Sequence, residues 1–180
     1  AVSTGKSVSA ELGGNNFMLV YADADLEQAA DAAIVGAFRN AGQACIAATH
    51  VLVEPSVEIA FMELLAAALE RHHPEKDRHA FQPMINRSHA ERIEQLISAA
   101  RHQEGLKLLS GSTPERHDNR IGPAIFTNVP PDSTLMREEI FGPVLTVTPL
   151  AACQFLSTAN ASGYGLAAYV WTKSETTGKA

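Results

Sequence analysis

Three short segments of this chain carry the residue types that could do chemistry. In the first, Glu11–Leu12–Gly13–Gly14, a carboxylate stands beside two glycines, which let the backbone turn tightly or approach another group closely. An acidic side chain next to such a turn can be held in a cleft. Taken alone, the segment is more typical of a turn that leads into a strand, with Glu11 in solvent.

The second segment, Asn40–Ala41–Gly42–Gln43–Ala44–Cys45, places a cysteine after a glycine-containing turn. A thiolate is a strong nucleophile, and polar surroundings or a helix N-terminus favour that form of a cysteine. The competing interpretation is that Cys45 is a small buried apolar residue, which is the usual role of a free cysteine.

The third segment, Arg137–Glu138–Glu139–Ile140–Phe141–Gly142–Pro143–Val144, joins two carboxylates to an aromatic residue and a Gly-Pro pair. Adjacent carboxylates usually form a solvated helix end, and an aromatic residue with Gly-Pro usually closes a turn into a strand. By itself the third segment therefore indicates no chemistry.

Taken together, in this order, the three segments resemble the aldehyde dehydrogenase superfamily. The family's Glu-Leu-Gly-Gly motif matches Glu11 to Gly14, its Gly-Gln-x-Cys motif matches Gly42 to Cys45, and its Glu-Glu-Ile-Phe-Gly-Pro motif matches Glu138 to Pro143. The 34 residues from Glu11 to Cys45 also suit the family. The resemblance covers nearly the whole chain, from about Lys6 to Trp171.

The resemblance implies a role for five residues of the chain. Cys45 would attack the aldehyde carbon, and the resulting thiohemiacetal would lose hydride to NAD or NADP and become a thioester. Glu11 would activate the thiol or the water that hydrolyses the thioester, and the backbone N–H of Cys45 would form half of an oxyanion hole. Glu139 would bind the nicotinamide ribose, Phe141 would pack near the nicotinamide, and Gly14 would keep the backbone small near the cofactor.

Parts of the family pattern are missing from the chain. Residues 1–180 are interpreted as a single catalytic domain that lacks the upstream cofactor-binding domain, with its oxyanion-hole asparagine and ribose-binding lysine. The strand used for oligomerisation would lie beyond Ala180, and the complete enzyme is expected to be a homo-oligomer. Within the chain, His50 stands where the family usually has arginine, and Phe17 stands where a proline or small residue is common. We expect this chain alone to be inactive.

Two other functions compete with aldehyde oxidation by NAD(P). A non-catalytic relative could use the same fold for binding or assembly, although the presence of both Glu11 and Cys45 argues against lost chemistry. Alternatively, Cys45 and Glu11 could support only ester hydrolysis, without a nicotinamide. Whether ester hydrolysis persists, and whether NAD alters it, discriminates between these functions.

The rest of the chain alternates strand-like and helix-like segments that must position these residues. Apolar or β-branched runs predict strands at 17–20, 50–53, 107–109, 144–147 and 167–171, with 126–133 extended. Helical periodicity predicts helices at 26–38 (capped by Asp23 or Asp25), at 56–71 (capped by Ser56), at 88–101 and at 152–161, and residues 110–123 are expected to form a loop. This alternation predicts an α/β fold with a mostly parallel sheet and helices on both faces.

Composition narrows the function classes further. The formal net charge is −6 without a Lys/Arg-rich run, which argues against binding nucleic acid or an anionic membrane surface. No apolar run approaches the roughly 20 residues that span a bilayer. Two cysteines are too few for a disulfide framework and indicate a reducing, cytoplasmic setting.

Several other residues have a structural and a functional interpretation. Four histidines, His72, His73, His79 and His89, could ligate a metal, but a solvated loop is the preferred interpretation, so no metal site is predicted. Cys153 begins an apolar helical run and is expected to be structural, and Tyr169 and Trp171 are expected in the core. Asn15 and Asn16 are interpreted either as a substrate-side contact, as in semialdehyde dehydrogenases, or as part of a turn.

Overall fold

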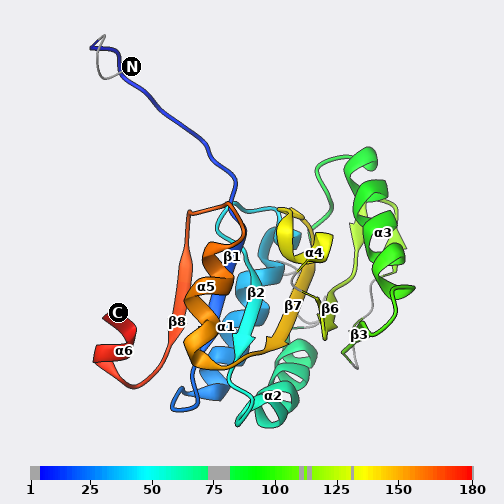
Figure 1. The fold of residues 1–180 in the computed structure, drawn as a ribbon. Coiled ribbons are helices and arrows are strands. Elements are labelled where there is room, and N and C mark those ends of the chain that lie inside the picture. The colour runs from blue at the N-terminus through cyan, green and yellow to red at the C-terminus, as the bar shows by residue number, and fades with distance from the viewer. Residues whose placement is uncertain (1–4, 73–81, 110–111, 113–114, 131, 180) are drawn as a thin grey trace.

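The computed structural model describes residues 5–72, 82–109, 112, 115–130 and 132–179. Six strands form one sheet in the order β3-β6-β7-β2-β1-β8 (Figure 1). Every neighbouring pair is parallel except β3 and β6, which are antiparallel. The strands of this sheet are β1 (Asn16–Val20), β2 (Ala48–Val53), β3 (Lys107–Leu108), β6 (Ala124–Thr127), β7 (Val144–Pro149) and β8 (Ala168–Trp171).

The remaining elements are helices and one small hairpin. The hairpin pairs β4 (Arg116–His117) with β5 (Arg120–Ile121). Among the described residues the α-helices are α1 (Leu26–Phe38), α2 (Glu58–Arg71), α3 (Arg87–Arg101), α4 (Thr134–Arg137), α5 (Phe155–Asn160) and α6 (Glu175–Lys179), and 3-10 turns form at η2 (Arg39–Gly42) and η3 (Ala152–Gln154). None of the helices within the described ranges is long and apolar enough to cross a membrane.

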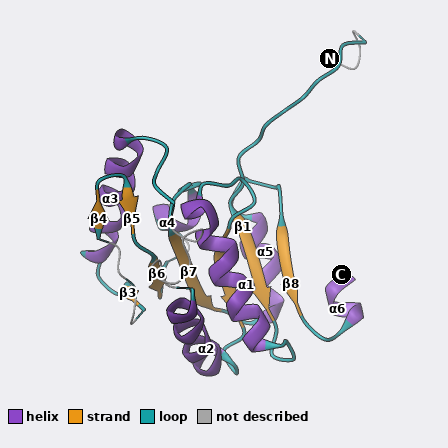
Figure 2. Cartoon of the chain, turned by 180° about the vertical axis from the view of Figure 1, so that it is seen from behind, coloured by secondary structure: helices purple, strands orange, loops and turns teal. Residues whose placement is uncertain are grey.

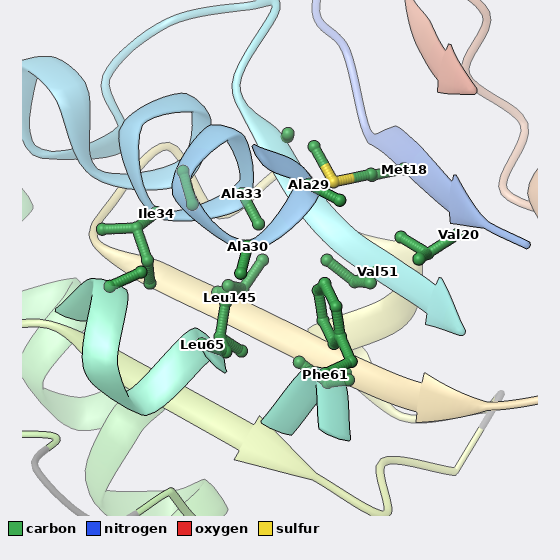
Figure 3. Packing of buried hydrophobic residues seen from close by; sticks show 14 of the residues in the cluster. Met18, Val20, Ala29, Ala30, Ala33, Ile34, Val51, Phe61, Leu65 and Leu145 are labelled. Atoms are coloured by element: carbon green, nitrogen blue, oxygen red, sulfur yellow. The ribbon is translucent and has the colours of Figure 1, made fainter. Parts of the chain in front are cut away.

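Helices cover both faces of the sheet, and each face buries its own apolar cluster. On one face α1 and α2 lie side by side (Figure 2) and pack on β1, β2 and β7. Small alanines of α1 let this helix approach the strand side chains closely, as Figure 3 shows for Ala29, Ala30 and Ala33 opposite Met18 and Val51. On the other face α3, α4 and α5 cover the sheet. The predicted α/β fold with a mostly parallel sheet is confirmed.

The predicted strands and long helices are present, and the cap of the first helix is identified. The Asp25 side chain accepts a hydrogen bond from the Gln28 N–H at 3.1 Å and so satisfies a free donor of the first turn of α1. Asp23 instead accepts hydrogen bonds from Thr172 and Lys173 at the end of β8.

Three local predictions are wrong. Ser56 does not cap α2, because the N-cap is Val57 and no side chain accepts a hydrogen bond there. The 110–123 stretch, part of which lies outside the described residues, contains the β4–β5 hairpin instead of only loop. Tyr169 and Trp171 are half-buried because β8 is an edge strand, so they flank the core rather than fill it.

The chain before β1 runs as an extended arm away from the folded body (Figure 1). All of residues 5–13 are exposed, whereas Gly14 and the residues of β1 are buried. The arm joins the fold at Gly13–Gly14, so the two glycines mark the point where the first motif meets the body.

Candidate active site

The cysteine of the second motif lies on a tight turn between α1 and β2. Three successive residues have positive φ angles, namely Asn40 (54°), Ala41 (54°) and Gly42 (71°). This conformation costs a non-glycine residue roughly 1–2 kcal/mol, so surrounding contacts must hold the turn. The Asn40 side chain supplies one such contact by donating from Nδ2 to the Gln43 carbonyl at 2.9 Å.

Gln43 ties this turn to the segment that leads into α3. Its Nε2 donates to the carbonyls of Asn40 (3.0 Å) and Pro83 (3.1 Å), and its Oε1 accepts from the Ile85 N–H (2.8 Å). Because every polar atom of the side chain is used, the glutamine of the Gly-Gln-x-Cys motif positions the turn that carries Cys45.

Gly14, the last residue of the first motif, packs between the second and the third motifs. The Gly14 N–H donates to Glu139 Oε1 at 3.1 Å. A Cβ atom at Gly14 would overlap the carbonyl oxygen of Cys45, and one at Gly13 would overlap Glu139 Oε2. Gly14 is therefore required by the close approach of a backbone atom, whereas a side chain at Gly13 would displace the Glu139 carboxylate, and the structure brings Gly14, Cys45 and Glu139 together.

The second and third motifs also meet through glycines. A Cβ atom at Gly42 would overlap the carbonyl of Gly142. Gly142 in turn packs on Ile93 of α3, since a Cβ there would lie 2.8 Å from Ile93 Cδ1. The three motifs, far apart in sequence, thus form one cluster.

Phe141 is held in a strained backbone conformation beside α3. Its φ angle is 55°, its carbonyl accepts a hydrogen bond from His89 Nε2 at 2.7 Å, and the two rings form an edge-to-face pair with centroids 6.3 Å apart. Arg92, one turn further along α3, donates to the carbonyl of Ile140. His89 and Arg92 therefore fix the loop between Glu139 and Phe141, a role that the sequence analysis missed. Their spacing of three residues on a predicted helix was the available signal.

The structure does not place the other predicted catalytic residue in this cluster. Glu11 is exposed and belongs to the extended arm. Cys45 is half-buried. Within the ranges that the structure describes, its backbone N–H donates to no protein acceptor and is therefore free to serve a ligand.

Cys153 and His89 depart from their predicted environments. Cys153 is exposed on η3, not buried in a helical core. His89 lies on α3 rather than in a loop, and His72 is 3.4 Å from the Asp31 carboxylate. His73 and His79 lie outside the described residues. Among the described residues no group of three His, Cys, Asp or Glu side chains could hold a metal.

His50, which stands where the family usually has arginine, is buried in a polar network below the site. Its Nε2 lies 2.6 Å from Asn15 Oδ1 and its Nδ1 lies 2.7 Å from Thr146 Oγ1. Asn15 Nδ2 donates to the Met136 carbonyl at 2.8 Å, so its Oδ1 must be the acceptor. His50 therefore carries its proton on Nε2, and the neutral ring accepts at Nδ1 from the Thr146 hydroxyl, whose single proton is then not donated to Met136 Sδ, 3.3 Å from the same oxygen.

This buried histidine should make folding depend on pH. Burial lowers the pKa of His50 from 6.5 to about 3, so the folded chain keeps the ring neutral where the unfolded chain protonates it. Its contribution to stability is complete above pH 6.5 and is lost as the pH falls toward 3. The free energy of unfolding should fall by about 2 kcal/mol between pH 7 and pH 5 through His50 alone.

Urea titrations at both pH values test this expectation, with His50→Gln as the control. The variant lacks the titrating ring, so its free energy of unfolding should fall by about 2 kcal/mol less than that of the unchanged chain over the same interval. An equal fall in both proteins would contradict the assignment of His50 as a buried neutral group.

Asn15 and Asn16 both have structural contacts rather than open positions facing a substrate. Asn15 is 5% exposed and Asn16 is 2% exposed. Asn15 belongs to the His50 network, and Asn16 donates to the carbonyls of Cys45 and Ala47. The pair does not form a turn either, because Asn16 is the first residue of β1 and Asn15 directly precedes it.

Comparison with known proteins places this cluster in a family. The model of the aldehyde dehydrogenase family matches residues 1–180. The chain is 41% identical over 173 residues to the NADP/NAD-dependent aldehyde dehydrogenase PuuC of Escherichia coli (strain K12), in an alignment that covers 93% of this chain and 34% of that protein. All three motifs lie within the matched residues.

Solved structures of similar proteins agree with the fold. The NAD-dependent aldehyde dehydrogenase of Sinorhizobium meliloti superposes with a TM-score of 0.83 at 36% identity, covering 98% of this chain and 36% of that one. The NADP-dependent glyceraldehyde-3-phosphate dehydrogenase of Bacillus halodurans C-125, solved with NADP, gives 0.83 at 34% identity, covering 94% and 36%. The chain spans about a third of the length of these relatives. With the family model matched along its whole length, the chain belongs to the aldehyde dehydrogenase family.

Proposed function

We propose that this chain is the catalytic domain of an enzyme that oxidises an aldehyde to a carboxylic acid with NAD or NADP. The observation that carries the proposal is the convergence of the three motifs, in which Gly14 contacts both Cys45 and Glu139. Relatives named as NAD- or NADP-dependent aldehyde dehydrogenases support both the reaction and the cofactor.

The proposed chemistry begins at Cys45. Its thiolate adds to the aldehyde carbon, a C–S bond forms, and the carbonyl oxygen takes up negative charge as the thiohemiacetal forms. The free backbone N–H of Cys45 would stabilise that oxyanion. When bound, NAD or NADP accepts the hydride that leaves this carbon, which is thereby oxidised to a thioester. Water then adds to the thioester, the C–S bond breaks, and the acid and the thiol are released.

The residues of the third motif fit a nicotinamide nucleotide. Glu139 is half-buried and presents a carboxylate, an acceptor suited to ribose hydroxyls, at the edge of the cluster. Phe141 is half-buried, its backbone is fixed by His89 and its ring contacts the His89 ring, so an aromatic ring is anchored two residues after Glu139. We propose that Glu139 binds the ribose and that Phe141 packs near the nicotinamide, with Gly14 leaving room for both.

We further propose that an upstream cofactor-binding domain completes the site and brings Glu11 to Cys45. The relatives are about three times as long as this chain, and Glu11 belongs to an arm that leaves the body at Gly13–Gly14. Packed against an upstream domain, the arm would carry the Glu11 carboxylate toward the thiol, where it would take a proton from the thiol or from the attacking water. We call the chain joined to this domain the extended polypeptide.

The reduction of NAD or NADP, followed by absorbance with a panel of simple aldehydes, tests the proposal. The extended polypeptide should reduce the cofactor, whereas the 180-residue chain should not. Holding the nicotinamide against the reacting carbon accounts for about 7–11 kcal/mol of the barrier, and the chain alone has no complete site for it. An extended polypeptide that hydrolyses esters but reduces no cofactor would instead establish the esterase function.

Cofactor binding by the 180-residue chain should be weak or undetectable. Glu139 and Phe141 would contact only the nicotinamide end of the dinucleotide, so most of the binding free energy is expected from the upstream domain. Calorimetric titration with NAD and NADP measures it directly. Micromolar affinity, about −8 kcal/mol, would show that this chain holds a complete cofactor site and would overturn the proposed division of the site.

A further inference from the structure

The side chain of Asn16 bridges the Cys45 turn to the start of β8. Its Nδ2 donates to the carbonyls of Cys45 (2.8 Å) and Ala47 (2.9 Å), and its Oδ1 accepts from the Ala167 N–H (3.1 Å). Two of these partners are acceptors and the third is a donor, so the orientation of the amide is fixed. At 2% exposure the side chain makes these bonds away from water.

These bonds control the backbone that carries the thiol. The Cys45 carbonyl defines the ψ angle of Cys45, and the Ala47 carbonyl lies two residues further along the same turn. Holding both oxygens on one amide therefore restricts the direction in which the Cys45 side chain leaves the turn. Gly14 takes part, because a Cβ atom there would press on both the Cys45 carbonyl and the Asn16 amide.

We propose that Asn16 is the positioning residue for Cys45, holding the thiol in its reactive geometry without touching the substrate. The inference rests on the proposed function, in which Cys45 is the nucleophile. An asparagine suits this role because serine is too short to reach two carbonyls, and aspartate would face both with a carboxylate that accepts but does not donate. A nucleophile misplaced by about 1 Å can lose 10²-fold in rate, so the effect on catalysis should be large.

Asn15 supplies a matched control one residue away. It is similarly buried, donates from Nδ2 to a backbone carbonyl (Met136, 2.8 Å) and accepts at Oδ1 from His50. Its contacts are with the His50 network and not with the Cys45 turn. Asn15→Ser and Asn16→Ser should therefore both destabilise the fold through lost buried hydrogen bonds, but only Asn16→Ser should release Cys45.

The first measurement is the rate at which iodoacetamide labels Cys45 relative to the exposed Cys153, read by mass spectrometry of the 180-residue chain. In Asn16→Ser the ratio should rise at least about fivefold, because a released turn exposes the half-buried thiol through local opening. In Asn15→Ser the ratio should stay within about twofold of the unchanged chain.

The second measurement is steady-state kinetics of the extended polypeptide. Asn16→Ser should lower kcat by about 10²-fold with little change in KM for the aldehyde. The variant should therefore be alkylated faster at Cys45 but oxidise the aldehyde more slowly than the unchanged enzyme. Asn15→Ser should leave kcat within about threefold. An unchanged labelling ratio and kcat in Asn16→Ser, or equal changes in both variants, would overturn the role of Asn16. An active Cys45→Ser enzyme would instead overturn the proposed function, so the two failures are distinguishable.

Discussion

Replacing Cys45 with serine in the extended polypeptide should abolish the reduction of NAD or NADP by aldehydes. A hydroxyl is a far weaker nucleophile than a thiolate at neutral pH. The substitution leaves the turn at Asn40–Gly42, and with it the rest of the site, in place. Removing the nucleophile of a covalent mechanism typically costs at least about 10⁴-fold in kcat. The assay is the absorbance of the reduced cofactor over time, at saturating aldehyde and cofactor.

Cys153→Ser is the matched control for this change. Cys153 is exposed on η3, and its loss should change kcat by less than about twofold. Activity in Cys45→Ser close to that of Cys153→Ser would show that another group attacks the aldehyde, and the assignment of the nucleophile would then be wrong.

Gly42→Ala should destabilise the fold by about 3 kcal/mol or more. Two costs combine at this position. The φ angle of 71° is unfavourable for alanine, and the new Cβ would overlap the Gly142 carbonyl, which is a backbone atom that cannot swing aside. Urea titration of the variant measures the loss as a shift of the unfolding midpoint.

Gly105→Ala separates the two costs. Its φ angle is 88°, but no heavy atom lies within 4 Å of the position that a Cβ would occupy. The Gly105→Ala variant should therefore lose only the stability that the unfavourable φ angle costs, about 1 kcal/mol. If Gly42→Ala destabilises the chain no more than Gly105→Ala does, the second and third motifs are not in the close contact described above.

The sequence predicted elements whose signals are local. The 26–38 helix shows a regular apolar face and a cap at Asp25, and Phe17–Val20 is a continuous apolar run, as expected for a strand buried on both faces. The errors arise where contacts between residues distant in sequence determine the local structure. Ser56 has the chemistry of a cap, but α2 begins one residue too late for its side chain to serve. The β4–β5 hairpin is too short for an alternating pattern to be visible.

The residues of the candidate site also divide into those that the sequence indicated and those that it did not. The family resemblance implied that Glu11, Gly14, Cys45, Glu139 and Phe141 form one site. The structure brings Gly14, Cys45 and Glu139 together and leaves Glu11 on the exposed arm. The residues that hold the site were not predictable, because their partners are distant in sequence: Asn16 reaches Ala167, and His89 reaches Phe141. Such pairings depend on strand order and helix position, which a single sequence does not reveal.

Trapping the acyl-enzyme tests the central claim, that Cys45 is the nucleophile, most directly. The extended polypeptide carrying Glu11→Gln should form the thioester but hydrolyse it slowly, because the proposed base for water is absent. After brief reaction with an aldehyde and NAD or NADP, mass spectrometry of its peptides should show the acyl group on the peptide that contains Cys45, in amounts equal to the reduced cofactor formed. Reduced cofactor without an acyl group on that peptide, or an acyl group on a different residue, would contradict it.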